Sequence, residues 1–172
     1  MVRHRLILTR HAKSSWATPG LRDHDRPLNK RGTRSCHLIG TMLKDSGFLP
    51  EVALVSTARR CVETFEGLVQ ATGTRVPCRL EPGLYHGSGP GMLDILRRAP
   101  EPVVLMIGHN PGIAHFASWL LSNPADADRH EQFRRYPTAA TSVIDFDVES
   151  WNAVREATGR LIDFRIPREL ES

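Results

Sequence analysis

Short runs of consecutive aliphatic residues constrain the fold of this 172-residue chain more than any other feature. They occupy residues 6–8, 52–55 and 103–107. Bulky side chains in succession predict strands covered on both faces, because a half-exposed strand alternates apolar with polar residues. Amphipathic helices are predicted after these runs, so the expected fold class is α/β: a three-layer α/β/α sandwich with a mostly parallel, mixed sheet.

Capping residues indicate where the predicted helices begin and end. The first helix is expected to begin near Asn29, an acceptable N-cap, and to end near Gly47, which suits the position just after a helix. The next is expected over residues 58–72. After the strand at 103–107, Asn110 is expected to cap a helix whose first position is Pro111.

The remaining segments predict the edges of the sheet. Residues 76–81 are expected to form a strand near an edge, because Pro77 lacks a backbone donor. Residues 141–148 alternate as in a half-buried strand, and residues 161–166 are expected to form a last edge strand. The polar residues 123–137 are expected to form an exposed connection.

The length and composition are those of an ordinary globular protein, so residues 1–172 are expected to form one domain. Neither a stretch of about 20 apolar residues nor a signal-peptide pattern is present, so a cytoplasmic protein without membrane association is expected. Cys36, Cys61 and Cys78 are odd in number and form no CxxC pair, which argues against a disulfide framework or structural zinc. Cys61 could be redox-sensitive or merely packed.

The formal charge of +4 has two readings, a nucleic-acid surface or an anion pocket. The chain has 23 basic residues, of which only three are lysines, and they form no dense tract. Aromatic residues, at 6% of the chain, do not interleave with them. The pattern therefore argues against nucleic acid as a partner.

Charged and polar residues follow the ends of three predicted strands. Arg10 and His11 follow the first, residues 56–60 follow the second, and His109 follows the strand at 103–107. Because the carboxyl ends of parallel strands form the ligand-binding edge of such sheets, these groups are expected to converge on one anion. A helix start beside His109 would add N–H groups.

This set of residue types suits phosphoryl transfer without a metal. A neutral imidazole can attack phosphorus and become a phosphohistidine. Planar guanidinium groups match the charge on the phosphoryl oxygens, and a second imidazole adds a donor when it is protonated. Each pattern alone also occurs as a surface pair, a turn or a helix cap, so the prediction rests on their occurrence together.

Three motifs now carry a resemblance to a known family. Thr9-Arg10-His11, then Ser, Arg and Thr at 56, 60 and 64, and then residues 108–111 (GHNP) resemble the three motifs of the histidine phosphatase, or phosphoglycerate-mutase-like, superfamily. The stretches RHAKSSW at 10–16, DHDRPLNKRG at 23–32 and YPTAA at 136–140 are similar to its SixA-like branch of phosphohistidine phosphatases.

The resemblance implies roles for individual residues. His11 would be the nucleophile, and Arg10, Arg60 and His109 would clamp the phosphate. Arg60 is preferred to its neighbour because it has the family's spacing to the threonine at 64. Two residues of the loop after His11 would add phosphate donors: Lys13 and Ser14.

Many members of the superfamily also use a carboxylic acid to protonate the leaving group. Glu81 is the best-placed candidate, with His86 behind it, although Glu81 could equally be a solvated strand end. Asp23 and Asp25 invite a metal reading, but nearby arginines argue against a dication, so neither a metal nor a cofactor is expected.

The resemblance implies a phosphatase acting through phospho-His11, with phosphohistidine on a partner protein as the first candidate substrate. No long insertion that could form a lid is visible, which suits a protein substrate. A phosphatase for small monoesters such as sugar phosphates or nucleotides is the alternative. A mutase or a non-catalytic phosphate-binding module is less consistent with the motifs, and the oligomeric state stays open.

Overall fold

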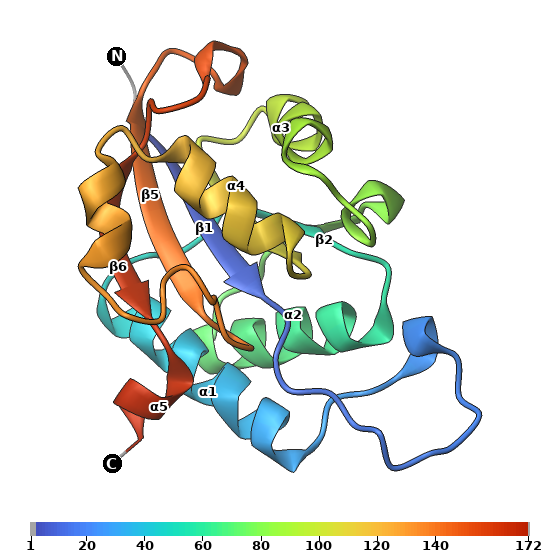
Figure 1. Cartoon of the computed structure of the whole chain (residues 1–172). Helices are drawn as coiled ribbons and strands as arrows, with labels where there is room; N and C mark the ends of the chain where they lie inside the picture. Colours follow the sequence, from blue (N-terminus) through green and yellow to red (C-terminus); the bar gives the residue numbers. More distant parts are fainter. Residues whose placement is uncertain (1–2, 172) are drawn as a thin grey trace.

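The computed structural model describes residues 3–171, whose strands form one six-stranded sheet (Figure 1). The strand order is β3-β2-β4-β1-β5-β6. The first four strands run parallel, whereas β5 is antiparallel to both of its neighbours, which confirms the predicted mixed sheet. The strands are β1 (Arg3–Arg10), β2 (Val52–Val55), β3 (Cys78–Leu80), β4 (Val103–Gly108), β5 (Thr141–Asp147) and β6 (Arg160–Arg165).

Helices cover both faces of the sheet, as the three-layer prediction requires (Figure 1). One layer contains α1 (Lys30–Asp45) and α2 (Arg59–Thr72), with the short α5 (Pro167–Leu170) packed on α1. The opposite layer contains α3 (Gly89–Arg97) and α4 (Gly112–Leu120). Short 3-10 turns lie between these elements, over Asp23–Asp25, Pro82–Leu84, Pro124–Asp128 and Trp151–Ala153.

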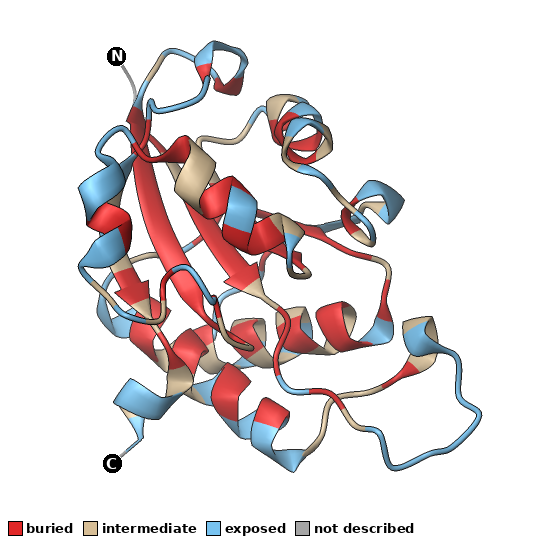
Figure 2. Cartoon of the chain, in the orientation of Figure 1, coloured by how far each residue is buried: buried red, intermediate tan, exposed pale blue. Residues whose placement is uncertain are grey.

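The aliphatic runs supply both cores because successive strand side chains point to opposite faces. On β1, Leu6 and Leu8 pack into the core under α3 and α4, whereas Ile7 packs into the core under α1 and α2. All three side chains are fully buried (Figure 2). No helix among residues 3–171 is long and apolar enough to cross a membrane.

The helix ends agree with the prediction at α1 and differ at α4. Asn29 caps α1 by accepting a hydrogen bond from the Gly32 amide at 2.8 Å. The predicted Asn110 cap is wrong: α4 begins at Gly112, and Pro111 takes the N-cap position. The Asn110 side chain instead donates to the carbonyls of Arg135 and Tyr136, each at 3.0 Å.

The prediction of an exposed connection over residues 123–137 is only partly right: more than half of the segment is exposed, but Phe133 and Tyr136 are not. Phe133 and Tyr136 are fully buried and pack against Phe164 of β6. The Ala139 amide, just beyond, donates to the carbonyls of Arg10 and His11 at 3.0 Å. Two buried aromatic side chains thus lie within a largely polar segment. Their packing holds the segment against the sheet, where the Tyr136 hydroxyl donates to the Leu8 carbonyl of β1.

Candidate active site

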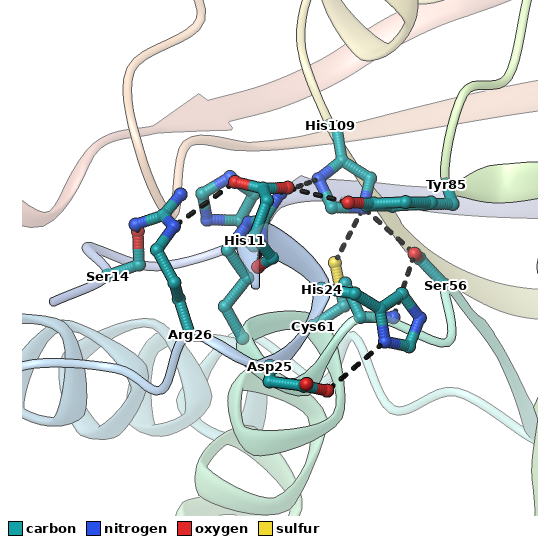
Figure 3. Close-up of polar contacts among 12 residues, drawn as sticks. His11, Ser14, His24, Asp25, Arg26, Ser56, Cys61, Tyr85 and His109 are labelled. Carbon is teal, nitrogen blue, oxygen red and sulfur yellow. Dashed lines mark hydrogen bonds and ion pairs between the residues drawn. The ribbon is translucent and has the colours of Figure 1, made fainter. Parts of the chain in front are cut away.

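A cavity of about 300 Å³ lies at the carboxyl ends of β1 and β4. Arg10 and Gly108 are register partners at the ends of these strands, so the next residues, His11 and His109, enter the same space. Figure 3 shows their rings near each other, with centroids 5.2 Å apart. The lining residues are Arg10, His11, Lys13, Ser14, Trp16, Asp23, Arg26, Arg60, Tyr85, His86, His109, Asn110 and Thr138.

His11 is held as a neutral imidazole with a defined tautomer. Its Nδ1 lies 2.7 Å from the Ala12 carbonyl oxygen, which can only accept, so Nδ1 carries the proton. Burial, followed by the nearby positive charges of Arg60 and Arg10, lowers the pKa of His11 to about 4, although the hydrogen bond to the Ala12 carbonyl acts in the opposite direction. Nε2 therefore retains its lone pair, as a nucleophile requires.

His109 is also neutral, with the opposite tautomer. Its Nδ1 accepts from Nη2 of Arg60 at 3.3 Å, so Nε2 carries the proton and donates to Ser56 Oγ at 2.8 Å. Burial lowers the pKa of His109 to about 3, with further contributions from His11 and Arg60. Cys61 lies 3.4 Å from Nε2, and burial raises the pKa of its thiol to about 12, so it packs as a neutral thiol.

Two guanidinium groups lie at the pocket with donors still unused. Arg10 donates through Nη1 to the Tyr136 carbonyl at 3.2 Å, and the buried Nε atoms of Arg10 and Arg60 have no hydrogen-bond partner among the described residues. Burial lowers the pKa of Arg10, and the charge of Arg60 lowers it further. Like charges held together with free donors favour an anion between them.

Asp23 organises the pocket, a role that the sequence reasoning missed. Its carboxylate accepts from Tyr85 Oη at 2.6 Å, Arg60 Nη2 at 3.0 Å and Arg26 Nε at 3.1 Å. Its carbonyl accepts from Arg60 Nη1 at 2.7 Å. The Tyr85 hydrogen bond, followed by those of the arginines, holds the pKa of Asp23 far below its usual range. The DHDRPLNKRG stretch that contains it was the available signal.

The motif of Ser56, Arg60 and Thr64 ties three elements together. Ser56 follows β2 and accepts from His109 at 2.8 Å. Thr64 sits one turn after Arg60 on α2, donates to the Arg60 carbonyl at 2.6 Å and accepts from the Ala12 amide at 2.9 Å. The three residues of this motif therefore position three parts of the site. Ser56 orients His109, Arg60 belongs to the phosphate clamp, and Thr64 holds the backbone beside His11. Arg59, by contrast, pairs with Glu63 at 3.0 Å and does not line the cavity.

Lys13 and Ser14, predicted as extra phosphate donors, both line the cavity. Lys13 is exposed, so its ammonium is free to reach an anion. The Ser14 hydroxyl accepts from Arg26 Nη1 at 2.7 Å (Figure 3), and a hydroxyl that accepts in this way keeps its own O–H to donate to an anion. Ser14 therefore holds Arg26 in place without losing this donor.

Glu81 does not reach the cavity, contrary to the prediction that it is the best-placed acid. Its carboxylate pairs with Arg98 at 3.2 Å. Glu81 follows the edge strand β3, and the chain turns there through Pro82–Leu84. Two later residues line the cavity instead, Tyr85 and His86, whose rings lie 4.3 Å apart.

Among residues 3–171, no three His, Cys, Asp or Glu side chains are grouped as metal ligands. The Asp-x-Asp pair is committed to arginines. Asp23 binds Arg26 and Arg60, and Asp25 accepts from Arg22 at 3.0 Å.

The comparisons identify the class of protein. Residues 6–86 match the sequence model of the histidine phosphatase superfamily (branch 1). An uncharacterized protein of Mycobacterium tuberculosis is 33% identical over 164 residues, covering 92% of this chain and 99% of the relative. The chain belongs to the histidine phosphatase superfamily, which includes phosphatases as well as phosphoglycerate mutases.

Within the superfamily, the chain falls in the SixA-like branch. A SixA protein from Agrobacterium tumefaciens superposes with a TM-score of 0.81 at 27% identity, over 97% of this chain and 100% of that one. The protein histidine phosphatase SixA complexed with tungstate superposes with a TM-score of 0.76 over 97% and 99% of the two chains. At 19% identity, this second likeness shows the fold alone.

Proposed function

We propose that the protein hydrolyses phosphohistidine on a partner protein without a metal, through a phosphorylated His11. The observation that carries this choice of substrate is the state of Asp23, the only carboxylate among the described residues that line the cavity. It is ionised and held by three donors, so it has no proton to give. An alkoxide leaving group needs the proton of a well-placed carboxylic acid much more than an imidazole does, so a histidine at the rim such as His86 suffices for the imidazole and assists an alkoxide only weakly.

The first step transfers the phosphoryl group to the enzyme. The lone pair on Nε2 of His11 forms a bond to phosphorus, while the P–N bond of the substrate breaks and its electron pair leaves with the substrate imidazole. Arg10 and Arg60 bind the phosphoryl oxygens through their unpaired donors. His86, at the rim, gives the leaving ring nitrogen its proton.

The second step releases phosphate. Water attacks phosphorus, the bond to Nε2 of His11 breaks, and the proton lost by water passes to neutral His86. His109 supports both steps once a bound phosphoryl group raises the pKa of its imidazole, because Nδ1 then takes up a proton and donates to an oxygen. Ser56 keeps the ring oriented throughout.

The test of this mechanism is capture of the intermediate. Brief incubation with labelled phosphohistidine protein should leave label on the enzyme as an acid-labile, base-stable adduct. The adduct should be absent from His11→Ala, whose turnover should fall by at least about 10³-fold. Activity should survive EDTA and be inhibited by vanadate. Full turnover by His11→Ala, or strict metal dependence, would contradict the mechanism.

The substrate class is tested by a panel measured under the same conditions. Phosphohistidine protein should exceed sugar phosphates and nucleotides in kcat/KM by at least about 10²-fold, the size of the contribution that a protonated carboxylic acid would make to ester cleavage. Preference for one small monoester would instead support the alternative phosphomonoesterase.

His86 is tested by the dependence on the leaving group. His86→Gln should slow esters with poor leaving groups by about tenfold or more, and p-nitrophenyl phosphate hardly at all. His115→Gln is the matched control, because His115 is an exposed histidine on α4 that does not line the cavity. An equal loss on every substrate would show that His86 is not the proton donor.

A further inference from the structure

Trp16 is a large apolar side chain left in solvent at the rim of the cavity. It is 76% exposed, more than any other large hydrophobic residue described, yet it lines the same cavity as His11. Residues 16–22 are all exposed, and Figure 2 shows this segment as part of a loop projecting from the body of the molecule. Packing of the core therefore does not account for the indole.

The indole is nevertheless held in place. The guanidinium carbon of Arg26 lies 3.6 Å from the centroid of the Trp16 ring, a close cation–π stack. Arg26 is itself buried and donates to Ser14 Oγ at 2.7 Å, to the Ser15 carbonyl at 3.2 Å and to Asp23 at 3.1 Å. One indole face is thus fixed on a rigid support, and the ring stays available to a ligand.

We infer that Trp16 is a docking residue for the phosphohistidine-bearing segment of a protein substrate, an inference that rests on the proposed function. A phosphoryl group bound by Arg10 and Arg60 leaves its carrier side chain at the rim, where Trp16 lies. The indole packs against the imidazole or the residues beside it. Since Trp16 is already ordered by Arg26, little conformational entropy is lost when it binds.

The support also connects Trp16 to the phosphate clamp. Arg26 and Arg60 share the carboxylate of Asp23, so removal of the indole could act indirectly by loosening Arg26. A direct docking role affects the affinity for the protein segment and leaves the affinity for the phosphoryl group unchanged. An indirect role affects both.

The experiment compares wild type, Trp16→Ala, Trp16→Phe and the control Leu49→Ala, a 38% exposed residue before β2 that does not line the cavity. Trp16→Ala should raise KM for phosphohistidine protein about tenfold, a loss typical of an aromatic interface residue. The kcat, the inhibition by vanadate and the hydrolysis of p-nitrophenyl phosphate should be unchanged. Trp16→Phe should recover most of the affinity, and Leu49→Ala should behave as wild type.

Three results would overturn the inference. A parallel loss of vanadate inhibition would show that Trp16 acts through Arg26. An unchanged KM for phosphohistidine protein would show that the indole contacts no substrate. A loss confined to nucleoside monophosphates would make the indole a platform for a base. A wild-type enzyme that does not hydrolyse phosphohistidine protein would instead contradict the proposed function, and the inference with it.

Discussion

Arg5 and Arg10 lie on the same strand, β1, and have opposite relations to their surroundings. Arg5 makes two hydrogen bonds to Asp145, from Nε at 2.7 Å and from Nη2 at 2.8 Å, and these raise its pKa. Among residues 3–171, Arg10 has no carboxylate partner and its buried Nε has no hydrogen bond, and burial beside Arg60 lowers its pKa.

The difference separates a structural charge from a functional one. The bidentate pair of Arg5 satisfies both partners within the protein, so it leaves nothing for a ligand. Around Arg10, positive charge exceeds what Asp23 neutralises, and the protein bears the cost of burying it. Such unfavourable placement is typical of binding sites, since the favourable contact comes from the ligand.

Between the two arginines, the larger expected effect on activity comes from Arg10. Arg10→Gln should lower kcat/KM by about 10²- to 10³-fold, because it removes a donor to the phosphoryl oxygens. Stability should be unchanged or slightly higher, since the repulsion with Arg60 disappears. Steady-state kinetics and thermal melting measure the two effects, and vanadate should raise the Tm of wild type but not of the variant. An Arg10→Gln variant that is less stable but fully active would show that Arg10 is a structural charge, as Arg5 is.

The pH dependence of stability tests the charge of the same region. His11 and His109 have folded pKa values of about 4 and about 3, below the usual 6.5, so the unfolded chain binds more protons between these limits. Stability should therefore be highest above pH 6.5 and fall by about 3 kcal/mol for each of the two histidines as the pH drops to 4. Urea unfolding across this range measures the slope.

Single variants test whether the two pocket histidines cause this dependence of the free energy of unfolding on pH. His11→Gln or His109→Gln should each flatten the curve, because glutamine takes up no proton. The exposed His115→Gln should leave it as steep as in wild type. Equal slopes in all the proteins would mean that the two buried histidines are not neutral.

Arg5 should show the converse of Arg10. Arg5→Gln leaves the carboxylate of Asp145, 1% exposed, with Arg3 at 3.5 Å as its one remaining basic partner in the described part of the chain. The free energy of unfolding should therefore fall by about 2 kcal/mol. The kcat/KM of the folded enzyme should stay within about twofold of wild type. Urea unfolding and steady-state kinetics on the same preparation measure the two effects. A large loss of activity would mean that Arg5 affects the site through β1.

Asp23 combines the structural pairing seen at Arg5 with the functional role seen at Arg10, because its carboxylate pairs with arginines of the active site. Asp23→Asn should lower kcat/KM by about tenfold, as Arg60 and Arg26 lose their shared acceptor and the clamp becomes less ordered. KM and kcat for phosphohistidine protein should be measured together with vanadate inhibition. A faster Asp23→Asn enzyme would show that the carboxylate competes with the phosphoryl group instead of positioning its ligands.

The sequence predicted the strands and the residues attached to their ends, because these follow from local pattern. Consecutive aliphatic residues predicted β1, β2 and β4, and the carboxyl edge of a parallel sheet then placed Arg10, His11 and His109 together. The resemblance to the family motif indicated Arg60 through its spacing to Thr64, and the structure places the two residues one helical turn apart on α2.

Residues on loops could not be placed in this way. Asp23 and Tyr85 meet because two loops approach over the pocket, and no periodic pattern specifies such a contact. Glu81 was misplaced for the same reason: it was predicted as the last residue of a strand, but β3 ends at Leu80, and the turn of Pro82–Leu84 directs later residues to the cavity. The aromatic anchors Phe133 and Tyr136 were hidden within a polar segment.

The smallest expected effect tests the rule that a paired charge is structural. Glu81 pairs with Arg98, whose side chain is 65% exposed, and an ion pair so accessible to water contributes little to stability. Glu81→Gln should therefore change kcat/KM by less than about twofold on both phosphohistidine protein and phosphomonoesters. Arg98→Gln, which frees the carboxylate, is the matched variant. If Glu81→Gln slowed phosphomonoesters alone, Glu81 would have to leave Arg98 during turnover, and pairing in the resting structure would no longer separate structural from functional charges.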